Sequence, residues 1–119
     1  MRDEKGNTLE TLLPLPPAVL HILIALGDGE RHGYSIMQDV SERTGGTVRM
    51  SPGTLYGSIK RMLADGLIEE LTTGAAGADE RRRFYRTTKF GRRVAAAEAD
   101  RLSALLAQAR SSGLVPRRS

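Results

Sequence analysis

The segment from residue 17 to residue 26, PAVLHILIAL, constrains the fold more than any other part of the sequence. Pro17 is well placed in the first turn of a helix, and apolar side chains then cover nearly its whole circumference. A helix of that kind has to be buried on more than one side. A chain of 119 residues supports one domain with one core. We therefore predict that the core of a single domain covers one side of this helix, and that a partner subunit covers the other.

Three further helices are expected from their start and stop signals. The second should run over residues 33–43, between the turn GDG and a pair of glycines. The third should begin at Pro52, directly after the N-cap Ser51, and continue to about Asp65, where Gly66 stops it. Thr88 is the expected N-cap of a last helix over residues 89–110, which carries apolar residues at helical spacing.

Two short strands are expected between the third helix and the last one. LIEELT and RRFYRT both read as strands, and the loop TGAAGADE between them is rich in glycine and alanine. Two strands around such a loop form a β-hairpin. The order of elements is therefore helix, helix, helix, hairpin and long helix. The predicted fold class is mainly α with a β-hairpin wing.

The charge of the chain is distributed unevenly. Residues 1–50 contain five Lys/Arg and seven Asp/Glu, whereas residues 51–119 contain thirteen Lys/Arg and seven Asp/Glu. A basic half of this kind is typical of a surface that meets a polyanion. The same charges would also fit a solvated basic tail, so charge alone leaves both interpretations open.

The third helix has an unusual outer face. Leu55, Ile59, Met62 and Leu63 fall on one side of a helical wheel, which we take as the core side. Gly53, Gly57 and Lys60 lie roughly opposite, flanked by Thr54 and Arg61, with Tyr56 at the border. Each helical glycine costs about 1 kcal/mol relative to alanine. Two of them on an exposed face favour close approach of a bulky partner such as a DNA groove, although an ordinary surface helix is the alternative.

The returning strand of the hairpin is basic. Arg81, Arg82 and Arg83 are consecutive, and strand alternation sends the middle one to the opposite face from the other two. A basic hairpin beside a recognition helix can follow a DNA backbone or enter the minor groove. Asp79 and Glu80 precede these arginines and offer the alternative of local ion pairs, which contribute little at a surface.

At this point the sequence resembles a known family. The run HGYSIMQDVSERTGGTVRMSPGTLYGSIKRMLADGLIEE resembles the core of PadR-like transcriptional regulators, and DERRRFYRTTKFGRR resembles their wing and its exit into the last helix. The resemblance implies a winged helix-turn-helix plus a C-terminal dimerisation helix. The expected organisation is a flexible N-terminal arm (1–16) with one short helical turn, a winged-helix DNA-binding domain (17–87), a C-terminal dimerisation helix (88–111) and a flexible tail (112–119).

The resemblance also implies roles for individual residues. Ser51, Thr54, Tyr56 and Lys60 match positions that contact DNA, and Tyr34 matches one that faces a phosphate. The wing arginines match positions that reach the flanking backbone. Together with the residues of the helix face, the predicted DNA-binding set is Tyr34, Ser51, Gly53, Thr54, Tyr56, Gly57, Lys60, Arg61, Arg81, Arg82 and Arg83.

A homodimer is expected on physical grounds as well. The apolar stripe of the last helix has no place on a core that three helices already occupy, so packing against the first helix of a partner would bury both. Folding back onto its own wing is the alternative for this helix. The predicted dimer interface consists of Leu20, Leu23, Ile24, Val94, Leu102, Leu105, Leu106 and Ala109.

The predicted function is that of a sequence-specific transcriptional regulator, a repressor that binds a pseudo-palindromic operator in double-stranded DNA as a homodimer. A small-molecule effector that releases the repressor is a further expectation. The sequence does not identify this effector, and the absence of Trp argues against a drug stacked on aromatics. The alternative is a winged-helix protein-interaction module without DNA readout.

Other classes of function find little support in the sequence. There is no Cys, and the two histidines, His21 and His32, lie on different elements, so neither a metal site nor any cofactor is expected. Glu69 and Glu70 are adjacent on a strand and point to opposite faces, which makes them a poor acid–base pair, and no enzyme is expected. The polar start MRDEKGNTLE is unlike a signal peptide, and the longest apolar stretch is too short to span a bilayer. A cytoplasmic protein without a membrane partner is therefore expected.

Overall fold

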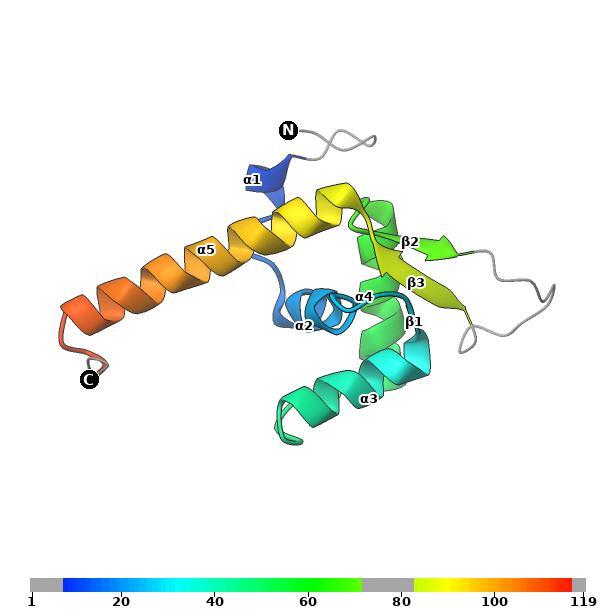
Figure 1. The fold of residues 1–119 in the computed structure, drawn as a ribbon, viewed down its shortest axis with the longest axis horizontal. Helices are drawn as coiled ribbons and strands as arrows, with labels where there is room; N and C mark the ends of the chain where they lie inside the picture. The colour runs from blue at the N-terminus through cyan, green and yellow to red at the C-terminus, as the bar shows by residue number, and fades with distance from the viewer. Residues whose placement is uncertain (1–7, 72–82, 117–119) are drawn as a thin grey trace.

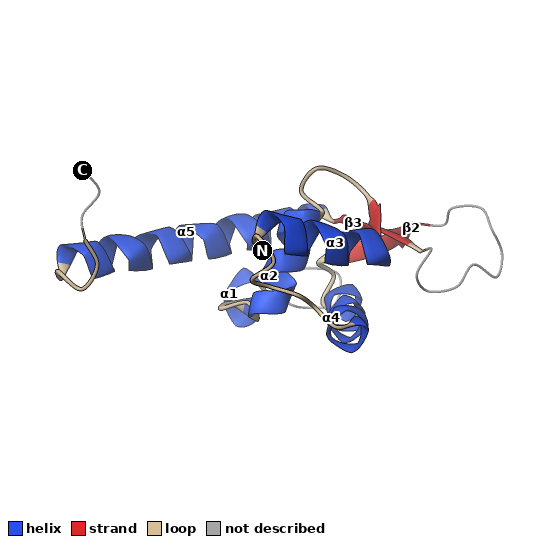
Figure 2. Cartoon of the chain, turned by 90° about the horizontal axis from the view of Figure 1, so that it is seen from below, coloured by secondary structure: helices blue, strands red, loops and turns tan. Residues whose placement is uncertain are grey.

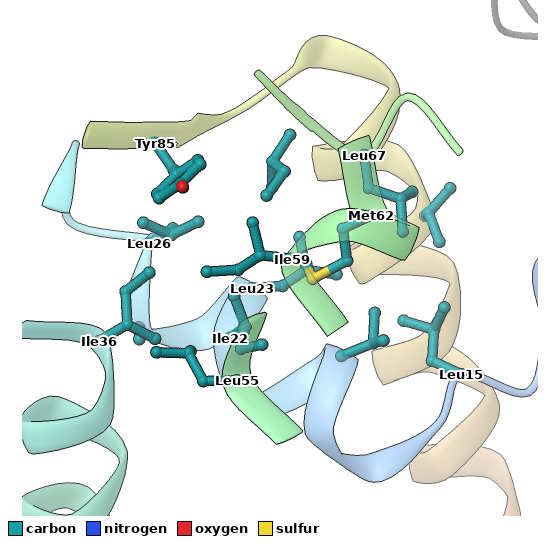
Figure 3. Packing of buried hydrophobic residues seen from close by; sticks show 14 of the residues in the cluster. Leu15, Ile22, Leu23, Leu26, Ile36, Leu55, Ile59, Met62, Leu67 and Tyr85 are labelled. Atoms are coloured by element: carbon teal, nitrogen blue, oxygen red, sulfur yellow. The ribbon is translucent and has the colours of Figure 1, made fainter. Parts of the chain in front are cut away.

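The computed structural model describes residues 8–71 and 83–116. At its centre lies helix α2 (Pro17–Ala25), which packs against α3 (Gly33–Arg43), α4 (Pro52–Ala64) and α5 (Lys89–Ser111) (Figure 1). The close view in Figure 3 shows how the buried side chains of α2 and α4 meet in one cluster. This arrangement confirms that the first long helix is buried on more than one side, and it is helices of its own chain that cover it.

Side chains cap the start of the three helices that follow α2. His32 caps α3, and its Nδ1 accepts the backbone N–H three residues later at 3.2 Å. Ser51 and Thr88 cap α4 and α5 in the same way, with N···O distances of 3.1 and 2.9 Å. The caps predicted at Ser51 and Thr88 are thus confirmed, and each fixes a helix start by satisfying an otherwise free N–H group.

The strands form a small antiparallel sheet. β2 (Ile68–Leu71) and β3 (Phe84–Thr87) are the two predicted strands, and they pair with Glu69 opposite Arg86. A third strand, β1 (Arg31–His32), pairs with the other edge of β3, so the order is β1-β3-β2. The sequence did not predict β1, because two residues are too few to show an alternating pattern. The fold class is nevertheless confirmed as mainly α with a hairpin.

Residues 8–16 contain the one short helical turn predicted for the N-terminal arm, but they pack against the rest of the chain. Residues 9–12 form the short helix α1 (Leu9–Leu12), which lies beside α5 (Figure 1). Leu9, Leu12 and Leu13 pack against the core, and Leu15 is itself buried. These apolar side chains pack beside α4 and α5. Residues 8–16 therefore belong to the folded domain.

Helix α5 has two different halves. Its first half is part of the core, where Phe90, Val94 and Glu98 are buried. Its second half projects away from the rest of the molecule, and Figure 2 shows this projection from below. Leu102, Leu105 and Leu106 are 41–47% exposed there. Within the described ranges, no helix has both the length and the hydropathy to cross a membrane.

Candidate nucleic-acid interface

Helix α4 separates a buried side from an open one. Leu55, Ile59 and Met62 are at most 3% exposed, and Leu63 packs on the cluster from its edge. The opposite side is exposed and consists of Ser51, Gly53, Thr54, Gly57, Lys60 and Arg61. The structure thus confirms the division of this helix into a core side and an outer side.

The two glycines leave the backbone of α4 accessible. A Cβ atom placed on Gly57 would meet no heavy atom from other parts of the described chain within 4 Å. One placed on Gly53 would meet only the Ser51 hydroxyl, at 3.9 Å. Packing inside the protomer therefore does not require glycine at either position. Their effect is to keep a smooth surface on which another molecule can come close to the main chain.

Polar groups surround this glycine surface. Ser51 Oγ lies 3.1 Å from both the N–H and the hydroxyl oxygen of Thr54, so these two side chains hold each other at the helix start. Arg61 is mostly exposed, with its Nε 3.7 Å from Asp65. Among the described residues Lys60 has no ion-pair partner, and its charge is available to a ligand. The surface thus offers cations, hydroxyls and a helix start, all of which suit phosphate oxygens.

Tyr56 lies at the contact between α3 and α4. It is half-buried, and its ring covers Gly33 at the start of α3. The hydroxyl of Tyr56 is buried in the contact between α3 and α4, and the DNA contact predicted for this residue remains a prediction. Tyr34, one residue further along α3, is 50% exposed, as a phosphate contact would require. Tyr56 helps to fix the angle at which α4 is presented.

This contact gives a testable expectation. In the variant Gly33→Ala, the new Cβ would lie 2.6 Å from Tyr56 Oη and 3.0 Å from its Cε1. Overpacking of this kind typically costs about 1–3 kcal/mol, so the variant should unfold at a lower urea concentration. Adding Tyr56→Phe removes the nearest atom and should restore part of the loss in a double-mutant cycle. A Gly33→Ala variant as stable as the parent protein would contradict the contact.

The base of the wing carries paired charges. Arg86 Nε lies 2.5 Å from Glu69 Oε1, and Arg83 Nη1 lies 3.5 Å from Glu70 Oε1. The two carboxylates therefore point to opposite faces, as predicted: Glu69 faces Arg86 of β3, and Glu70 faces Arg83, which directly precedes that strand. Sequence reasoning missed these pairs, because the pattern of the two strands did not fix their register. The predicted contacts Arg81 and Arg82 lie outside the described residues.

The predicted dimer residues fall into two groups. Leu23 and Val94 are 4% and 0% exposed and belong to the core of their own protomer, so assigning them to the dimer interface was wrong. Both side chains belong to the core cluster in which α2 and α5 of one protomer pack together. A helical pattern alone cannot reveal this contact. Ile24, Leu102, Leu105 and Leu106 are between 41% and 47% exposed, and Leu20 and Ala109 are half-buried. For these six residues the dimer contact remains a prediction.

A network of charges holds α3 in place beside α2. Arg31 donates from Nε to the Ala25 carbonyl at 2.8 Å and from Nη2 to Asp39 Oδ1 at 3.2 Å. Arg43 bridges Asp39 and Asp28 at 2.6 and 2.7 Å. The part of the chain that the structure describes contains no group of three or more His, Cys, Asp or Glu that could hold a metal ion.

Comparison with known proteins assigns the chain to a family. The model of the transcriptional regulator PadR-like family matches residues 19–97. Transcriptional regulator Rv3488 of Mycobacterium tuberculosis is 44% identical over 76 residues, which are 61% of this chain and 64% of that protein. The match thus spans less than two thirds of the length of this relative.

Solved structures show the same fold. A PadR family transcription regulator from Clostridium difficile superposes with a TM-score of 0.68 over 84% of this chain and 100% of its own, at 22% identity. Bacillus subtilis PadR, solved in complex with operator DNA, has a TM-score of 0.59 and 26% identity over 75% of this chain and 48% of its own. With the family match over residues 19–97, the chain belongs to the PadR-like family of transcriptional regulators.

Proposed function

We propose that this protein is a sequence-specific DNA-binding repressor that binds a pseudo-palindromic operator as a homodimer, with α4 in the major groove. The observation that carries the proposal is the open outer side of α4, where no residue of the described ranges covers Gly57 or forms an ion pair with Lys60. A protein-interaction surface would favour aromatic and apolar anchors at this place. The Bacillus subtilis relative of the same fold was solved with its operator DNA.

The second half of α5 supports the dimer. Helix α5 has 23 residues and is about 35 Å long, and its exposed leucines form one apolar face. A two-fold pair of protomers that buries these faces would present two copies of α4 to DNA. In dimeric helix-turn-helix proteins the two recognition helices lie about 34 Å apart, one turn of DNA. Release of the repressor by a small molecule remains a prediction.

The direct test is DNA binding by the variant Lys60→Ala. Each dimer loses two cations from the proposed groove contact, so affinity for the upstream DNA of its own gene should fall roughly 10- to 100-fold. The slope of log K against log salt should also become shallower by about two. Fluorescence anisotropy at several salt concentrations measures both quantities.

The matched control is Arg92→Ala, which removes one exposed positive charge from α5 and should leave affinity within about threefold of the parent. Equal affinity of Lys60→Ala and the parent protein would refute α4 as the contact. If the parent dimer shows no specific, salt-dependent binding to this DNA, the regulator proposal fails and an interaction module becomes the better reading.

A further inference from the structure

A buried carboxylate sits in the middle of α5. Glu98 is 1% exposed, the lowest exposure of any charged residue in the described parts of the chain. Arg101 donates to it from Nε at 2.5 Å and from Nη2 at 3.0 Å, and the backbone N–H of Leu15 donates to Oε2 at 3.0 Å. The hydrogen bonds from Arg101 and from Leu15 lower the pKa of Glu98 against the opposing effect of burial. The group is therefore ionised where it meets the N-terminal segment.

The segment of the same chain that meets Glu98 contains only one main-chain N–H group that can donate a hydrogen bond. Residues 14–17 read Pro-Leu-Pro-Pro, and a proline has no backbone N–H, so Leu15 supplies the single N–H of this stretch. The three rings also restrict the φ angles, which makes the segment stiff. Because Leu15 is buried, its N–H would lack a partner without Glu98. One hydrogen bond therefore fixes a rigid piece of chain, which we call the strap (residues 13–16), against α5.

The strap contacts α4 with its other side. Leu12, Leu15 and Pro16 line one wall of a small crevice. The same crevice is lined by Arg61 and Met62 from the last turns of α4 and by Asp65, which caps that helix. Figure 3 shows Leu15 and Met62 in the same buried cluster, next to the ribbon of α5. The strap thus lies between the helix proposed to read DNA and the helix proposed to form the dimer.

Glu98 also marks the place where α5 leaves the protomer. It is the last buried residue of the helix, and Leu102, one turn later, is 41% exposed. From Glu98 to Ser111 the helix extends roughly 20 Å, and none of its residues beyond Glu98 is buried in the described parts of the protomer. A tilt of about 10° at Glu98 would displace the far end by roughly 3.5 Å, which is about the rise of one base pair.

We propose that Glu98 is a positioning residue that locks the angle between α5 and α4 through the strap, and so sets the distance between the two recognition helices of a dimer. The first half of this inference concerns a single protomer. The second half rests on the proposed function. Replacing Glu98 by a neutral or apolar residue should therefore change the angle between α5 and α4 while the protomer stays folded.

The geometry can be measured without DNA. Since the sequence contains no Cys, Ala64→Cys on α4 and Ala104→Cys on α5 give two unique, exposed sites for spin labels. Doubly labelled protein diluted with excess unlabelled protein reports the α4–α5 distance within one protomer by pulsed electron resonance. We expect a narrow distribution for the parent, and a width at least doubled or a centre shifted by at least about 3 Å for Glu98→Leu.

The controls separate positioning from mere stability. Asp100→Asn removes a carboxylate from the exposed side of α5, two residues away, and should leave the distribution unchanged. Glu98→Gln keeps the size and an acceptor for Leu15 but loses the charge toward Arg101, and should show a smaller change in the same direction. All samples are compared at a temperature where circular dichroism shows them folded. If Glu98→Leu does not fold, a Glu98→Gln distribution that superimposes on the parent overturns the proposal.

DNA binding then tests the second half. The parent is used to select a two-half-site sequence from random DNA, and the spacer is changed by one base pair in each direction. We expect the parent to lose at least 10-fold in affinity on the altered spacers, and folded Glu98→Leu to discriminate less than 3-fold. Unchanged discrimination would overturn the link to dimer geometry. If the parent selects no DNA, the proposed function fails, while the spin-label distances still decide the role of Glu98 in the protomer.

Discussion

An alanine at position 91 is expected to destabilise the folded chain by about 3 kcal/mol or more. A Cβ on Gly91 would lie 2.0 Å from the carbonyl oxygen of Leu67 and 2.9 Å from its carbonyl carbon. Both are main-chain atoms, so no side-chain rotation can relieve the overlap. The same carbonyl accepts the N–H of Thr88 at 3.1 Å, which holds the two segments together. Either the first turn of α5 or the segment between α4 and β2 must therefore move.

Urea unfolding followed by circular dichroism measures this loss as a lower midpoint. The matched control is Gly57→Ala, the same substitution in a helix where the new Cβ meets open space. That variant should become more stable by about 0.5–1 kcal/mol, because alanine loses less conformational entropy than glycine when a helix forms. A loss below 1 kcal/mol for Gly91→Ala would show that the junction between the wing and α5 is looser than described.

The positions of the main elements could be predicted from local signals. Ser51 followed by Pro52, and Thr88 before a helical stripe, are signals that depend on a few neighbouring residues, and both caps form as expected. The glycine pair after α3 has positive φ angles of 61° and 81°, a conformation that glycine adopts without strain. Where neighbouring residues within one turn determine the backbone conformation, that conformation can be predicted from the sequence.

Contacts between distant segments could not be predicted in the same way. The pattern of α2 shows that it must be buried on several sides, but it does not show whether Leu23 meets α5 of its own chain or of a partner. Leu9 and Leu12 were placed in a flexible arm because no local signal ties them to α5. A stronger signal was present at Glu98, which interrupts the apolar series of Val94 and Leu102 at four-residue spacing. A charge at such a position indicates a specific partner inside the fold.

The double variant Gly53→Ala/Gly57→Ala is expected to change stability and DNA affinity in opposite directions. Helix propensity alone should raise the free energy of unfolding by about 1 kcal/mol, since neither new methyl group meets a close neighbour in the protomer. If a DNA groove approaches the outer side of α4, the two new methyl groups of each protomer would keep the DNA away from the helix backbone. A dimer carries four such methyl groups. We expect operator affinity to fall by about 3 kcal/mol, or roughly 100-fold.

A rise in the free energy of unfolding together with a fall in DNA affinity is a specific result, because general damage to the fold would lower both. Thermal unfolding and anisotropy on the same preparations give the two values. Ser111→Ala, which removes a side-chain oxygen from the exposed end of α5, should raise stability slightly and leave affinity unchanged. A double variant that binds DNA as tightly as its parent would mean that the helix backbone is not approached closely. The two glycines would then need an explanation other than a nucleic acid, because packing among the described residues does not require them.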